Sequence, residues 1–186
     1  MQALESNGLT LGHGSATVPP SDVLEDDFRL EIIGAGDRQA FELLFHEYYG
    51  QLAHFLSLLL PTMPTRELCE EVFAEVWSSA GAARPANLSA MTLVLTIGLR
   101  QAAEFRSAGA SVDTRFTYLG ESQSREEFRR KLGELQWEQR VVATLVYGMG
   151  LPPQTISQIT AMSDQEISGH LSGARQQLRP RGQQLA

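Results

Sequence analysis

The stretch LPPQTISQITAMSDQEISGHLSGARQQL, residues 151–178, carries the most informative local pattern in this chain. Its spacing predicts two helices joined by a short turn. Two helices that cross steeply at such a turn need a small residue where they pack, a small turn residue and a buried aliphatic residue. Ser157, Ala161 and Ile167 stand at these three places, and the remaining apolar contacts are expected from Ile156, Ile159 and Met162. The pattern predicts a helix-turn-helix.

The second of these helices presents polar residues on its outer face. Ser163 or Asp164 is expected to cap it by accepting a backbone N–H bond. In a helix-turn-helix that binds DNA, the N-terminal end of this helix enters the major groove. The candidate DNA-contacting residues are Gln165, which suits adenine, together with Glu166, Ser168, His170, Arg175 and Arg179. An ordinary helical hairpin with a solvated polar face has the same spacing, so both interpretations stand at this point.

Upstream of this motif, apolar residues at intervals of three and four trace further helices. Asp37 is the expected N-cap of the longest one, which ends near Leu60 because Pro61 and Pro64 break it. The predicted helices run over 22–33, 37–60, 65–80, 88–106, 125–132, 134–147, 153–160 and 164–178. Because no useful β-alternation occurs, the chain is predicted to be all-α.

Two interruptions of the helical pattern set the domain boundaries. Residues 1–21 carry glycine and proline among small polar residues, which predicts a flexible N-terminal tail. Residues 108–124 lose the periodicity again and are predicted to form an interdomain linker. The predicted architecture is therefore two small helical domains, a four-helix domain over 22–107 and a helix-turn-helix domain over 125–186.

The net charge of −7 argues against tight binding of nucleic acid, because phosphates repel an acidic protein. Basic side chains make most phosphate contacts, so an acidic total lowers the expected affinity of autonomous DNA binding. A local basic stripe matters more than the total. Since the negative charge is concentrated in residues 1–108, the C-terminal part repels DNA less than the N-terminal part does.

The composition also bears on other classes of protein. A hydrophobic content of 42% is sufficient for packed cores. Cys69 is the single cysteine, and no Cys/His spacing predicts a zinc site, so neither a disulfide within the chain nor a cofactor is expected. No apolar stretch approaches the roughly 18 residues of a membrane span, and no signal peptide is recognisable. A cytoplasmic protein without membrane contacts is therefore expected.

Two stretches together resemble bacterial RNA polymerase sigma factors of the extracytoplasmic-function (ECF) type. GDRQAFELLFHEYYGQLAHFLSLLL at 36–60, followed by ELCEEVFAEVW at 67–77, is similar to the family's region two. LQWEQRVVATLVYGMGLPPQTISQITAMSDQEISGHLSGARQQLR at 135–179 is similar to region four, which contains the family's helix-turn-helix. Both stretches occur in the order and separation typical of the family.

The resemblance implies a protein without enzymatic activity that binds core RNA polymerase and directs promoter recognition and transcription initiation. Three sets of residues are implied. Region two would bind the polymerase through Leu68, Glu70, Glu71, Phe73 and Trp77. The next helix would meet the minus-ten element through Arg100, Gln101, Glu104 and Arg106, and region four would meet the minus-thirty-five element through the residues named above. An anti-sigma factor is a further candidate partner, and the free protein is expected to be a monomer.

Plainer interpretations exist for the polymerase-facing residues. Phe73 and Trp77 are also typical of core packing, and the glutamates of 67–77 are also typical of a solvated helix face. The sequence leaves the two interpretations open.

Both DNA-facing segments depart from the family's pattern. In the segment at 87–109, Gly98-Leu99-Arg100 replaces an Ala-Arg-Asn triplet and Glu104 replaces an aspartate that is followed by several arginines. In the recognition helix, residues 166–170 replace a Thr-Val-Lys-Ser-Arg run. These losses fit either a sigma factor that uses an unusual promoter with few phosphate contacts, or an alternative function in which DNA binding is weakened or gone. The chain would then be a degenerate sigma-like regulator that binds polymerase or an anti-sigma factor without sequence-specific DNA binding.

Two other classes of protein remain as alternatives. For a small all-α enzyme, the four histidines form no predicted cluster with Cys69 or with a carboxylate pair. For an unrelated helix-turn-helix repressor, dimers that read palindromic half-sites are expected.

Overall fold

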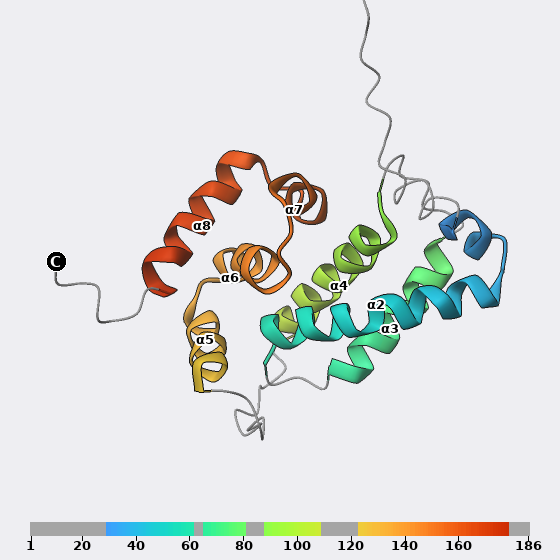
Figure 1. Ribbon diagram of the computed structural model, residues 1–186, viewed down its shortest axis with the longest axis horizontal. Coiled ribbons are helices and arrows are strands. Elements are labelled where there is room, and N and C mark those ends of the chain that lie inside the picture. The colour runs from blue at the N-terminus through green and yellow to red at the C-terminus, as the bar shows by residue number, and fades with distance from the viewer. Residues whose placement is uncertain (1–28, 62–64, 81–87, 109–122, 179–186) are drawn as a thin grey trace, which may run out of the picture.

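A computed structural model of the chain describes residues 29–61, 65–80, 88–108 and 123–178 (Figure 1). Within these residues all regular structure is helical and no strand occurs, which confirms the predicted all-α class. The helices are α2 (Arg38–Leu59), α3 (Thr65–Ser79), α4 (Ala90–Ser107), α5 (Gln123–Glu134), α6 (Trp137–Ala143), the π-helix η1 (Thr144–Gly148), α7 (Pro153–Thr160) and α8 (Asp164–Leu178). Residues 29–34 are also helical and belong to the helix expected over 22–33.

Some of the predicted domain organisation lies outside the described residues. This applies to the predicted tail over 1–21 and to residues 109–122 of the predicted linker. The described residues of 29–108 form the first half of the protein, and residues 123–178 form the second half.

Side-chain caps start two of the long helices in the first half. Asp37 precedes α2, and its carboxylate accepts a hydrogen bond of 3.0 Å from the backbone N–H of Ala40. Ser89 precedes α4, and its hydroxyl accepts one of 3.2 Å from the N–H of Thr92. Each cap satisfies an amide that has no partner within its own helix. The Asp37 cap lies where the sequence predicts it.

The predicted helix over 134–147 differs from the structure at both ends. α6 begins at Trp137, because the chain first leaves α5. The last turns are π-helical rather than α-helical, and the N–H of Met149 donates to the carbonyl of Thr144 at 3.0 Å. A π-turn adds one residue to the helical repeat, so a periodicity of 3.6 does not predict it.

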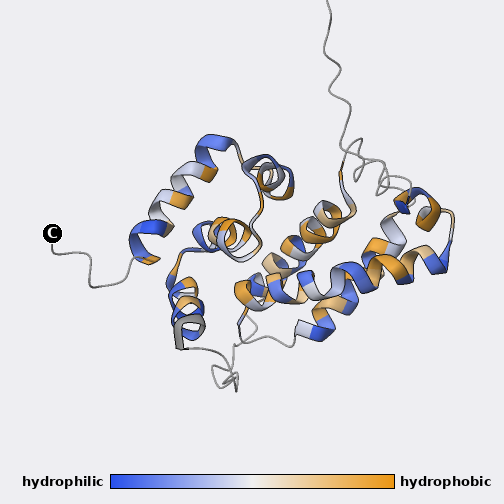
Figure 2. Ribbon diagram, in the orientation of Figure 1, coloured by the Kyte–Doolittle hydropathy of each residue, from blue (hydrophilic) through white to orange (hydrophobic). Residues whose placement is uncertain are grey.

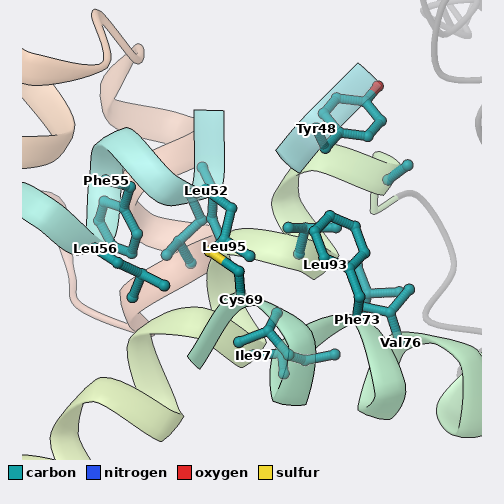
Figure 3. Close-up of a cluster of buried hydrophobic side chains, with 14 of the residues drawn as sticks. Tyr48, Leu52, Phe55, Leu56, Cys69, Phe73, Val76, Leu93, Leu95 and Ile97 are labelled. Atoms are coloured by element: carbon teal, nitrogen blue, oxygen red, sulfur yellow. The ribbon is translucent and has the colours of Figure 1, made fainter. Parts of the chain in front are cut away.

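The core of the first half lies between α2, α3 and α4 (Figure 3). Leu52 and Phe55 of α2 are fully buried, as is Val72 of α3. Gly98 lets α4 approach α2 closely, since a Cβ atom there would lie 2.7 Å from Cδ1 of Leu52. Figure 2 shows hydrophobic and hydrophilic stretches side by side along these helices, as expected of helices with one buried face.

The two halves share one apolar core rather than lying apart. α7 packs against α4, and both η1 and α5 pack against α2. The main core cluster includes residues of both halves; those of the second half are Val141, Val142, Leu145, Ile156, Ile159 and Ile167. A second, smaller cluster joins Leu58 of α2 to Leu132, Leu135, Ala143 and Ala174. Burial of apolar area across this junction stabilises the contact between the halves.

Among the described helices, none has both the length and the apolar character needed to cross a lipid bilayer.

Candidate nucleic-acid interface

α7 and α8 form a helix-turn-helix whose turn is built by Ser157 and Ala161. Ala161 adopts the left-handed conformation with φ 56°, and its N–H donates to the carbonyl of Ser157 at 2.8 Å. The Ser157 hydroxyl donates to the carbonyl of Met162 at 2.6 Å, while Ile167 is buried beyond the turn. In Figure 1 α7 is seen nearly end-on whereas α8 runs across the view, so the helices cross steeply. The three small and aliphatic residues lie in the places that the sequence predicts.

Ser163 caps α8 through a reciprocal pair of hydrogen bonds with Glu166. The Glu166 carboxylate accepts from the N–H of Ser163 at 2.8 Å and from its hydroxyl at 2.7 Å, and the N–H of Glu166 donates back to that hydroxyl at 3.4 Å. This is a capping box, which satisfies amides at the start of the helix. Hydrogen bonds from the Ser163 side chain and backbone lower the pKa of Glu166 below its usual range. Glu166 therefore serves the helix cap and adds negative charge at the end that would face DNA.

The other predicted residues of α8 differ in their exposure. Gln165 and Ser168 are exposed, whereas His170 is half-buried. Arg175 is exposed, and its Nε donates to the hydroxyl of Tyr147 at 2.8 Å. Arg179 lies outside the described residues. Within the described part of α8, Arg175 is thus the arginine on this face.

The minus-ten residues predicted on α4 form one network with a residue of α3. Arg100 makes ion pairs with Glu75 of α3 and with Glu104, its Nη1 lying 2.6 Å from Oε1 of Glu104. The Gln101 amide donates to Oε2 of Glu75 at 2.9 Å. The structure thus brings three of the four predicted residues together. The sequence allows Glu75 a place on a solvated face or on a partner surface. It does not predict the contact with Arg100, because the two residues are 25 positions apart and share no local pattern.

This network carries a net negative charge, since one guanidinium faces two carboxylates. Burial alone would raise the pKa of Glu75, but hydrogen bonds from Gln101 and Arg100, with the charge of Arg100, lower it below its usual range. The hydrogen bonds that Arg100 donates to Glu104 and Glu75 raise the pKa of Arg100. Arg100 is therefore charged but already neutralised in this arrangement, and a phosphate would have to displace a carboxylate from it.

Arg106, the fourth predicted minus-ten residue, contacts the second half of the protein. Its guanidinium carbon lies 4.7 Å from the centroid of the Trp137 ring on α6. A cation over an aromatic face is attracted by the ring's quadrupole, which contributes about 0.5–1 kcal/mol at an exposed site. The side chain points to a neighbouring helix rather than joining the network of Arg100.

The residues predicted to bind polymerase do not share one surface. Leu68 and Phe73 are buried in the core with 3% and 2% exposure, as the core-packing interpretation expects. Glu70 and Glu71 are exposed, and Glu70 pairs with Arg66 at 2.9 Å within the same helix. Trp77 is half-buried with its ring 5.1 Å from that of Phe41. The accessible part of this set is therefore two carboxylates and the edge of one indole.

A row of aromatic residues on α2 adjoins that surface and was not singled out from the sequence. Phe41, Phe45 and Tyr49 are each half-buried and lie around Phe73, with the Phe45 and Phe73 centroids 4.7 Å apart. Their spacing of four residues was a recognisable signal for one helix face. Together with Trp77 they make the most aromatic part of the described surface of α2 and α3.

Arg140 and Leu58 lie at the junction of the halves, and neither was assigned a role from the sequence. Arg140 donates from Nη1 to the carbonyl of Leu59 at 3.2 Å, and from Nη2 to the carbonyls of Gly133 at 2.5 Å and Leu135 at 3.2 Å. Burial and the charge of Arg106 lower the pKa of Arg140. No local pattern predicts the contact with Leu59, because the two residues are far apart in the chain.

No group of three potential metal-ligating side chains occurs in the part of the chain that the structure describes. Cys69 is fully buried, and burial raises the pKa of its thiol to about 11. A buried thiol of this kind is a poor nucleophile.

Comparisons with known proteins bear on the fold. No protein-family model matches the chain, and no curated protein matches it in sequence. Among solved structures the chain is similar to CnrH, determined in complex with the cytosolic domain of CnrY, with a TM-score of 0.64. The alignment covers 82% of this chain and 94% of the CnrH chain at 20% sequence identity. At this identity the likeness shows a shared fold.

Proposed function

We propose that the protein is an ECF-type sigma factor, which binds core RNA polymerase and directs it to promoters. CnrH, whose fold the chain shares, is an ECF sigma factor. The observation that carries the proposal is the helix-turn-helix of α7 and α8, closed by Ala161 and capped by Ser163, at the end of a chain with this fold. A shared fold does not by itself imply function, so the proposal depends on the side chains of this motif.

In this proposal α8 reads the minus-thirty-five element. The exposed Gln165 and Ser168 lie in its first turns, the part of a recognition helix that reaches base edges. Arg175 would exchange the Tyr147 hydroxyl for a phosphate, which is a stronger acceptor for a guanidinium. Because phosphate contacts position the protein, this exchange would set the register of α8 on the duplex.

α4 would meet the minus-ten element where the strands separate. Single strands are held by stacking and by basic groups. Arg100 and Arg106 are the basic residues of α4, and each is engaged, one by Glu75 and Glu104 and the other by Trp137. DNA binding by α4 therefore requires both arginines to exchange their partners.

Polymerase binding would use the exposed surface of α3. Glu70 and Glu71 offer carboxylates, and the half-buried Trp77 and Phe41 offer an adjoining aromatic edge. Such a surface fits a partner helix that is basic with an apolar stripe, because rim charges steer association and aromatic side chains contribute much of the affinity. Leu68 and Phe73 would support this surface from beneath rather than contact the partner.

A second function is favoured by one specific observation, the net negative network around Arg100. A sigma-like regulator that binds polymerase or an anti-sigma factor without reading DNA would tolerate this network. The cytosolic domain of CnrY is the partner of CnrH in its structure, and a comparable anti-sigma factor is a candidate partner here. In either function we propose a cytoplasmic protein that is a monomer when free and carries out no covalent chemistry.

The test is run-off transcription of fragmented source DNA by core polymerase with and without the protein, followed by sequencing of the transcripts. New start sites that share upstream elements are expected. Arg175→Ala should reduce the yield of those transcripts while polymerase capture stays unchanged, whereas Arg130→Ala, an exposed arginine of α5, should leave both unchanged. Polymerase capture without any new transcript would favour the second function, and the absence of capture would overturn the polymerase-binding proposal.

A further inference from the structure

Leu58 of α2 lies in the core of the second half of the protein. Its neighbours on α2, Leu56 and Leu59, belong to the main cluster between α2, α3 and α4. Leu58 is only 4% exposed, yet its buried contacts form the smaller cluster, whose other members all come from the second half: Leu132, Leu135, Ala143 and Ala174, with Phe128 and Leu178 packed against them. The side chain of Leu58 therefore fills a site in the second half that these residues line, here called the socket.

The backbone of η1 is shaped to receive this side chain. A Cβ atom at Gly148 would lie 2.5 Å from Cδ1 of Leu58, closer than two carbon atoms can approach. The π-turn of Thr144–Gly148 brings this glycine against the end of α2, and Gly148 is the last residue of that turn. Leu58 and Gly148 are thus fitted to each other across the junction.

Arg140 links the same end of α2 to the end of α5 by hydrogen bonds. Its guanidinium joins the carbonyl of Leu59, the residue next to Leu58, to the carbonyls of Gly133 and Leu135 at the end of α5. These carbonyls lie at or beyond helix C-termini, where backbone acceptors lack helical partners. Removing the guanidinium would leave three acceptors on two halves without this shared donor.

Closure of this junction also places the second half against the helix proposed to meet DNA. With Leu58 in its socket, α7 packs on α4 and Trp137 lies under Arg106. α7 is the first helix of the helix-turn-helix, so the two proposed DNA-binding elements are held against each other. While the halves stay together, α4 and α8 keep one fixed separation, so they could adjust to two separate promoter elements only if the halves part.

We propose that Leu58 and Arg140 form a clasp that holds the free protein closed, and that this clasp opens when the protein binds core polymerase. The closed state is supported by the contacts at the junction, and its opening by polymerase rests on the proposed function. A closed state lowers the apparent affinity of any partner that binds only the open state, by the fraction of molecules that are open.

The clasp is tested by measuring the distance between two labels in the full-length protein. Labels are attached to cysteines introduced at the exposed Gln51 of α2 and Gln176 of α8, while the buried Cys69 reacts slowly. Pulsed electron spin resonance should give one narrow distance distribution for the otherwise unchanged protein. Leu58→Ala and Arg140→Ala should each shift it to longer and broader distances.

Matched variants separate the clasp from general effects of mutation. Leu43→Ala removes a leucine of the same helix that is 59% exposed, and Arg130→Ala removes an arginine of α5 that pairs with Glu134 in the same helix. Both should keep the narrow distribution. Circular dichroism checks that each variant keeps its helices, and Gly148→Ala, which crowds Leu58, replaces any variant that does not. A broad distribution in the unchanged protein, or narrow ones in folded clasp variants, would overturn the clasp.

The opening step is tested separately by titrating unlabelled protein with core polymerase. The clasp variants should bind about tenfold more tightly than the unchanged protein, because they no longer lose affinity to the closed state. Equal affinities with lengthened distances would overturn the opening step. If no variant binds polymerase while the distances change as expected, the proposed function fails and the clasp stands.

Discussion

Arg100 of α4 is held by both carboxylate oxygens of Glu75 on α3, across 25 positions of sequence. The pair links two helices of the first half and at the same time withholds the guanidinium from an incoming phosphate. Exposed ion pairs contribute little to stability, typically about 0–1 kcal/mol. The Arg100–Glu75 pair therefore changes the electrostatic potential around α4 more than it changes the stability of the fold.

Replacing Glu75 should strengthen binding of a promoter fragment with an open minus-ten region. Glu75→Gln removes one of the two carboxylates that neutralise Arg100, so the guanidinium becomes available to a phosphate. The slope of log affinity against log salt should steepen by about one phosphate contact. Fluorescence anisotropy of the labelled promoter fragment, with the polymerase complex at several salt concentrations, measures this slope. Glu67→Gln removes an exposed charge of the same helix outside the proposed docking surface, and an equal steepening there would indicate a net-charge effect instead.

The pH dependence of stability should carry the signature of Glu75. Because the pKa of Glu75 is lowered in the folded protein, its contribution is fully present above the ordinary value of 4.5 and is lost as the pH falls through the lowered value. Glu75→Gln should therefore be less stable than the unchanged protein at pH 7, by under about 1 kcal/mol because the pair is exposed. Urea unfolding at pH 7 and at pH 3 should show the difference shrinking. A difference that is the same at both pH values would contradict the assignment.

Removing the cap of α8 should destabilise the helix-turn-helix. Ser163→Ala loses the hydroxyl that bonds the N–H and the carboxylate of Glu166, which costs about 1 kcal/mol. Thermal unfolding followed by circular dichroism should show a lower Tm. Ser168→Ala, at an exposed position of the same helix, should not lower it, and equal losses in the two variants would argue against the capping box.

Reversing the exposed charges of α3 should weaken polymerase capture. In Glu70→Lys combined with Glu71→Lys, two carboxylates become ammonium groups on the proposed docking surface, which would repel a basic partner. Pull-down with immobilised core polymerase should lose most of the bound protein. Glu42→Lys together with Glu134→Lys makes the same change in charge at other exposed positions, and should bind as the unchanged protein does. Unaffected capture by the α3 variant would remove that surface from the proposal.

The thiol of Cys69 should be unreactive toward thiol reagents in the folded protein. Its pKa of about 11, against an ordinary value of 9.0, lowers the thiolate fraction at pH 8 by about a hundredfold, and burial excludes the reagent as well. A chromogenic disulfide reagent should react slowly with native protein and rapidly after unfolding in urea. Rapid reaction of the native protein would show that the core around Cys69 opens readily.

Local patterns were sufficient to predict most helices of this protein. α7 and α8 have the predicted bounds, Asp37 caps α2 as expected, and the small residues Ser157 and Ala161 build the predicted turn. Each of these features depends on residues within about four positions of one another, so the sequence near it carries the whole signal. The π-turn over 144–148 is an exception, since its last residue, Gly148, packs against Leu58, which lies far away in the sequence.

The state of the candidate site depends on tertiary structure. The sequence identified Arg100, Arg106 and Arg175 as basic residues, but not that each is engaged, by Glu75 and Glu104, by Trp137 and by Tyr147 respectively. It likewise placed Phe73 on a helix without distinguishing core from surface.

Short-range spacing and capping chemistry act within one or two helical turns, and for that reason the helices, their caps and the helix-turn-helix could be predicted from the sequence. Three features emerged only from the folded chain: the two halves share a core, Leu58 fills a socket beside Gly148, and Arg140 reaches the carbonyl of Leu59 across 81 positions. Contacts at such separations arise from the packing of whole helices, and no local pattern encodes which side chains that packing brings together.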